Sequence, residues 1–124
     1  MKKVIATLLV LCCCLAADGL FKPGAALADS PEALALSYDL QTQILTVTIT
    51  HKSTFTGLHY IKQVSIGRNG EPVEKKEYSS QTGKATFVYT YKVPAAAGDV
   101  LEVTAVCNIS GKKTATLPVG AEKP

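Results

Sequence analysis

Hydrophobic and polar residues alternate along most of the chain from residue 34 onward, and a period of two is typical of half-buried β-strands. Two of the clearest segments, Ile44–His51 (ILTVTITH) and His59–Ile66 (HYIKQVSI), follow each other in the sequence. Five further segments show the same pattern: Leu34–Leu40, Val73–Tyr78, Ala85–Val93, Leu101–Cys107 and Lys113–Val119. Seven short strands separated by turn residues, without a helical period, predict an all-β fold, an immunoglobulin-like seven-stranded antiparallel β-sandwich.

The clearest turn of the chain is Arg68-Asn69-Gly70-Glu71. Asn-Gly tolerates the positive φ angles of a tight hairpin, so this turn should connect two neighbouring strands. Pro72 follows it and cannot donate a backbone hydrogen bond, and the next segment, Val73–Tyr78, is rich in charge. Both features predict a strand at the edge of a sheet.

The first residues have the pattern of a secretory signal peptide. Lys2 and Lys3 precede an apolar run, Val4–Ala17, that is too short to span a bilayer comfortably. Ala26-Leu27-Ala28 fits the small-x-small rule for cleavage. The sequence therefore predicts a signal peptide over residues 1–28, one domain over residues 29–124, and a periplasmic or secreted protein without a membrane span in its mature form.

Removal of this segment changes the cysteine count and the charge. Of the four cysteines, only Cys107 remains, so the mature chain cannot form an internal disulfide. A lone thiol indicates a metal ligand, a reactive group or intermolecular pairing, or else a small buried hydrophobic residue.

Ten basic and nine acidic residues in the mature chain give a net charge of +1. With no basic stripe, no glycine-rich phosphate loop and no hydrolase motif, we expect neither a nucleic-acid partner nor a classical hydrolase.

Both histidines of the protein border one strand-to-strand connection. His51 is in phase with the inward residues of its strand, and His59 is expected at the first position of the next strand. In an immunoglobulin arrangement the sixth strand ends at the same pole, so Cys107 should lie near both imidazoles. Such a donor set suits iron, copper or zinc, although the chain after Leu27 has no Met for the axial position of a blue-copper site. The alternative is that the histidines bind backbone groups at the rim and that Cys107 only packs.

The pattern His51…His59-Tyr60-Ile61, Asn69-Gly70 and Cys107-Asn108-Ile109 followed by Gly111 resembles the iron-binding domain of superoxide reductases (desulfoferrodoxin and neelaredoxin). That family has an immunoglobulin-like sandwich, holds iron with four histidines and an axial cysteine thiolate, and reduces superoxide to peroxide. The resemblance implies that His51 and His59 are equatorial ligands and Cys107 the axial one. Ser110 stands where the family has a histidine, and the upstream histidine is also missing, so full reductase activity is not expected.

The chain also resembles the Z subunit of sulfur oxidation, a related sandwich that supplies a binding surface and no metal chemistry. The residues that carry this resemblance are His59–Val64, Asn69-Gly70, Ala97-Gly98-Asp99 and Gly111–Thr114. Two functions therefore follow from the sequence. One is an exported superoxide-reductase-like redox module with iron in an incomplete His/Cys site and an electron donor. The other is a metal-free carrier or scaffold that contacts an exported partner through Val73–Tyr78 or the loop pole.

Overall fold

A computed structural model describes residues 30–120, and these residues form seven β-strands. The strands are β1 (Ala33–Asp39), β2 (Ile44–Thr50), β3 (Ile61–Arg68), β4 (Glu71–Glu77), β5 (Thr86–Lys92), β6 (Val100–Cys107) and β7 (Lys112–Pro118). Between residues 30 and 120, no helix is long and apolar enough to cross a membrane. The predicted signal peptide, residues 1–28, lies outside the described residues.

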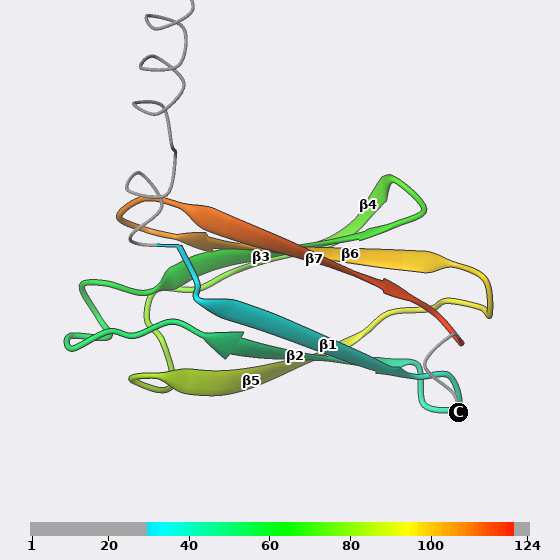
Figure 1. Cartoon of the computed structure of the whole chain (residues 1–124), viewed down its shortest axis with the longest axis horizontal. Helices are drawn as coiled ribbons and strands as arrows, with labels where there is room; N and C mark the ends of the chain where they lie inside the picture. Colours follow the sequence, from blue (N-terminus) through cyan, green and yellow to red (C-terminus); the bar gives the residue numbers. More distant parts are fainter. Residues whose placement is uncertain (1–29, 121–124) are drawn as a thin grey trace, which may run out of the picture.

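The strands form two antiparallel sheets, β1-β2-β5 and β4-β3-β6-β7, stacked face to face (Figure 1). This arrangement confirms the predicted immunoglobulin-like sandwich. It also confirms that the charged strand predicted after the Asn-Gly turn lies at a sheet edge; this strand, β4, begins at Glu71 and includes Pro72. The β2–β3 loop (residues 51–60) and the β6–β7 turn (residues 108–111) lie at the same end of the sandwich, on the left in Figure 1. We call this end the histidine pole.

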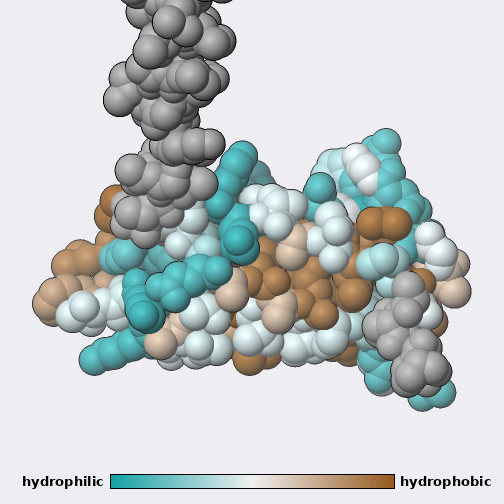
Figure 2. All heavy atoms as spheres, in the orientation of Figure 1, coloured by the Kyte–Doolittle hydropathy of each residue, from teal (hydrophilic) through white to brown (hydrophobic). Residues whose placement is uncertain are grey.

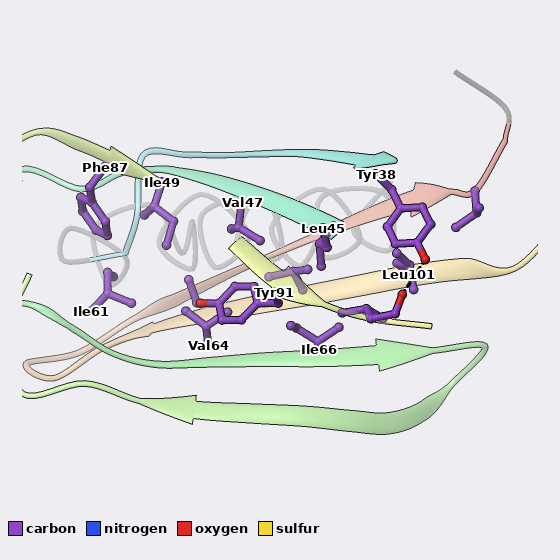
Figure 3. Packing of buried hydrophobic residues seen from close by; sticks show 14 of the residues in the cluster. Tyr38, Leu45, Val47, Ile49, Ile61, Val64, Ile66, Phe87, Tyr91 and Leu101 are labelled. Carbon is purple, nitrogen blue, oxygen red and sulfur yellow. Dashed lines mark hydrogen bonds between the residues drawn. The ribbon is translucent and has the colours of Figure 1, made fainter. Parts of the chain in front are cut away.

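The core fills the space between the two inner faces. Val47 and Ile49 of β2 point toward the opposite sheet, where Val64 and Ile66 of β3 face them (Figure 3). These side chains are at most 1% exposed. Removing such apolar surface from water contributes about 25 cal/mol per Å². The inward row of β2 continues into His51, which carries a polar side chain to the end of the core.

At the opposite pole, the β3–β4 hairpin has the predicted geometry, with φ angles of 54° at Asn69 and 86° at Gly70. The Asn69 side chain ties this hairpin to the β5–β6 connection. Its Nδ2 donates to Asp99 Oδ1 at 3.0 Å, and its Oδ1 accepts from the Val100 N–H at 2.9 Å. Asp99 also accepts from the Ala96 N–H at 2.9 Å.

These hydrogen bonds make the stability depend on pH in acid. The Asn69 amide, and then the Ala96 N–H, lower the pKa of Asp99 below its usual value of 3.8. Because the folded pKa is the lower one, the stabilisation is complete above the unfolded pKa and is lost as pH falls through the folded pKa. We expect Asp99→Asn to have a flatter decline of Tm between about pH 5 and pH 2 than the parent protein. Equal slopes in thermal unfolding would contradict this.

Candidate metal centre

His51 directly follows β2 and points into the sandwich, as its phase in the sequence predicts. Its side chain is 2% exposed. Its backbone N–H donates to the Ala85 carbonyl at 2.8 Å, which continues the pairing of this strand beyond Thr50. The same alternation that turns the core side chains of β2 inward therefore also turns the His51 imidazole inward.

His59 lies two residues before β3, so the prediction that it starts the strand was wrong. Its backbone N–H donates to the Phe55 carbonyl at 2.9 Å, which closes a turn inside the β2–β3 loop. Regular pairing is also interrupted at Tyr60, whose N–H donates to Asn108 Oδ1 at 2.8 Å. The Asn108 backbone N–H also donates to the Tyr60 carbonyl at 2.9 Å, so Tyr60 pairs with both the side chain and the backbone of Asn108. The half-buried imidazole of His59 remains on the loop.

Cys107 ends β6 opposite Ile61 of β3, and its side chain is 2% exposed. Its N–H donates to the Gly111 carbonyl at 3.0 Å, and its Sγ accepts from the Ile109 N–H at 3.4 Å. Gly111 has a φ of 88°, and a Cβ at this position would overlap Ser30. The turn therefore requires glycine, and its backbone surrounds the sulfur.

The structure brings the three predicted residues together. Ligand atoms of His51, His59 and Cys107 all lie within 4.8 Å of one another. The two imidazoles meet edge to face, with ring centroids 4.7 Å apart and planes at 72°. Between residues 30 and 120, this is the one group of at least three histidine, cysteine or acidic side chains that is spaced to hold a metal ion. The convergence predicted from strand topology is confirmed.

The spacing fits a metal ion after a small contraction. With metal–nitrogen and metal–sulfur distances near 2.1 and 2.3 Å, tetrahedral ligand atoms lie about 3.6 Å apart. The distances between the donor atoms would therefore have to shorten by at most about 1.2 Å. Three protein donors would fill part of the coordination sphere of a metal ion. Ser110, in the β6–β7 turn, is exposed.

Gln81, in the loop between β4 and β5, is a site residue that the sequence did not reveal. It is 4% exposed, and its Oε1 lies 2.8 Å from His51 Nδ1. Its Nε2 donates to the carbonyls of His51 and Gly83 at 2.7 and 2.8 Å. In the sequence it stands in a polar stretch, Ser79–Gly83, with no pattern that separates it from an ordinary loop residue.

Asn108 is a second residue that supports the site, and the sequence did not indicate this role. Its Nδ2 donates to the Leu58 carbonyl at 3.0 Å, and its Oδ1 accepts from the Tyr60 N–H. The two hydrogen bonds hold the residues on either side of His59. The residue next to the thiol therefore positions the loop that carries an imidazole.

Comparisons with known proteins find similarity among solved structures. No family model and no curated protein matches the chain. Among solved structures, it is similar to a superoxide reductase (1Fe-SOR) from Giardia intestinalis, with 19% identity and a TM-score of 0.46 over 75% of this chain and 99% of that one. It is also similar to a superoxide reductase (neelaredoxin) from Archaeoglobus fulgidus, with 15% identity and a TM-score of 0.42 over 73% and 93%.

Proposed function

We propose that this chain is a small exported redox module, similar to superoxide reductases, in which His51, His59 and Cys107 bind one iron ion. The observation that carries the proposal is the convergence of two imidazoles and one thiol, with donor atoms within 4.8 Å. Nitrogen and sulfur donors suit iron, copper and zinc. Iron is the expected occupant because the sequence resemblance implies it, and copper and zinc are the alternatives that the same donors accept.

The backbone next to Cys107 contacts its sulfur. The Ile109 N–H donates to Sγ at 3.4 Å, and the side chain is 2% exposed. Sulfur binds metals as the thiolate, so Cys107 would supply the one anionic donor of the site. A bound ferrous ion would supply one electron to superoxide, which takes up two protons from solvent to give hydrogen peroxide. With two of the four family histidines missing, we expect this reaction to be slow.

The surface around the site supports docking of a protein electron donor. Three large apolar side chains at the histidine pole, Phe55, Leu58 and Ile109, are 67%, 73% and 59% exposed. Figure 2 shows hydrophobic residues at this end of the molecule. The strand ends and loops at this pole carry Lys52, Lys62, Lys84, Lys112 and Lys113, against Glu32 and Glu77. An apolar centre with surrounding lysines suits a partner with an acidic docking face.

The same exposed apolar surface favours the second candidate, a metal-free carrier or scaffold. In that case the protein stays folded in chelator, and an exported partner remains bound to it without any metal. The β4 edge, Glu71–Glu77, is the other possible contact surface. One measurement therefore separates the two functions, namely the metal content of the folded chain.

Metal content tests the proposal. We expect mass spectrometry of protein from the exported fraction, purified without chelator and without oxygen, to find close to one iron per chain. The intact mass from the same sample tests cleavage after Ala28. His51→Ala should lose the metal, whereas Gln63→Ala, on β3, should keep it. Folded parent protein that holds no metal and takes up none from added ferrous, copper or zinc salts would overturn the proposal and favour the scaffold.

A further inference from the structure

The orientation of the Gln81 side-chain amide follows from the backbone around it. A glutamine amide has a nitrogen with two N–H donors and an oxygen that only accepts. The Gln81 nitrogen faces the carbonyl oxygens of His51 and Gly83 at 2.7 and 2.8 Å, and both of these groups only accept. A reversed amide would place its oxygen against two other oxygens. The nitrogen must therefore occupy this position.

With the nitrogen fixed, the position of the oxygen determines the proton on His51. Gln81 Oε1 accepts from the Ile61 N–H at 3.2 Å and lies 2.8 Å from His51 Nδ1. Because this oxygen cannot donate, Nδ1 must carry a proton to form the hydrogen bond. A neutral His51 then has its lone pair on Nε2, so Nε2 is the ring nitrogen whose chemistry allows it to bind a metal.

We infer that Gln81 is a positioning residue that holds His51 in the Nδ1–H tautomer and directs the Nε2 lone pair to the proposed metal site. The metal part of this inference rests on the proposed function, whereas the tautomer part does not. Gln81 contacts the residues at both ends of the β2–β3 loop, His51 and Ile61. It therefore also holds the two ends of the loop that contains His59. Groups that orient a ligating histidine typically change metal affinity 10–100-fold when removed.

The tautomer can be measured directly in metal-free protein by long-range ¹H–¹⁵N NMR of the imidazole rings. We expect the neutral His51 of the parent protein to be protonated at Nδ1. Gln81→Met keeps the length of the side chain and removes the acceptor, so it should move His51 toward the Nε2–H form. It should also weaken binding of Fe(II) or Zn(II) by about 10–100-fold. Gln63→Met, a half-buried glutamine whose amide donates to Ser65 Oγ instead, is the matched control and should change neither quantity.

The outcomes separate this inference from the proposed function. A parent protein with His51 protonated at Nε2 overturns the positioning role, whatever metal it binds, and this measurement needs no variant. Unchanged tautomer and unchanged affinity in Gln81→Met also overturn it. A parent with the Nδ1–H tautomer that takes up no metal supports the fixed tautomer but overturns its metal role together with the proposed function.

Discussion

Cys107→Ser is expected to abolish metal uptake. Serine has nearly the same shape, but its hydroxyl stays protonated at neutral pH, whereas the thiolate is the sulfur form that binds metals. The change removes the one anionic ligand and leaves two neutral imidazoles. We therefore expect metal affinity to fall by more than the 10–100-fold that changes around a ligand typically cause. Metal content after dialysis against low concentrations of Fe(II) or Zn(II) measures the effect.

A matched control separates metal loss from damage to the fold. Ala105 lies two residues earlier on β6 in the same inward row and is fully buried. Ala105→Ser and Cys107→Ser both bury a hydroxyl, which costs about 1–3 kcal/mol of stability. Only Cys107→Ser should lose the metal. Stoichiometric metal in Cys107→Ser would mean that Cys107 is a packing residue and not a ligand.

Asn108→Ala should weaken metal binding and destabilise the fold without removing any ligand. It deletes the hydrogen bonds to the Leu58 carbonyl and from the Tyr60 N–H, which hold the loop on both sides of His59. Losing one exposed and one partly buried hydrogen bond costs about 1–3 kcal/mol. A less restrained His59 should lower metal affinity by about 10–100-fold. Chemical denaturation and metal titration measure the two effects separately.

The control is Asn69→Ala, which deletes an equivalent pair of hydrogen bonds at the opposite pole. Asn69 donates to Asp99 and accepts from the Val100 N–H. Its φ of 54° adds backbone strain for alanine, so it should lose at least as much stability as Asn108→Ala. Metal affinity should be unchanged in this variant. Equal losses of affinity in both would show that the effect follows general stability and not the position of His59.

The fold and the three candidate ligands could be predicted because both depend on short-range patterns. Period-two alternation defined the strands and placed His51, directly after β2, in phase with the inward residues of that strand. Chain order in an immunoglobulin-like sandwich then placed Cys107 at the same pole. The confirmed group of His51, His59 and Cys107 needed no more than strand phase and topology.

The supporting residues could not be predicted, because their contacts join segments without a shared pattern. Gln81 reaches His51 across 30 residues, and Asn108 reaches Tyr60 across 48. The latter contact lies next to His59 and adds a side-chain hydrogen bond where alternation assumes only a regular strand pair. Export and the signal peptide stay predictions, because residues 1–28 lie outside the described part of the chain.

If the protein is exported, as the sequence predicts, the depth of Cys107 in the sandwich determines how its thiol behaves in an oxidising compartment. Disulfide exchange requires one sulfur to approach another in line, and a side chain that is 2% exposed offers no such path. Folded copies therefore cannot cross-link through this residue, whereas unfolded copies expose it. Covalent dimers in such a compartment would thus consist of chains that had lost their native fold.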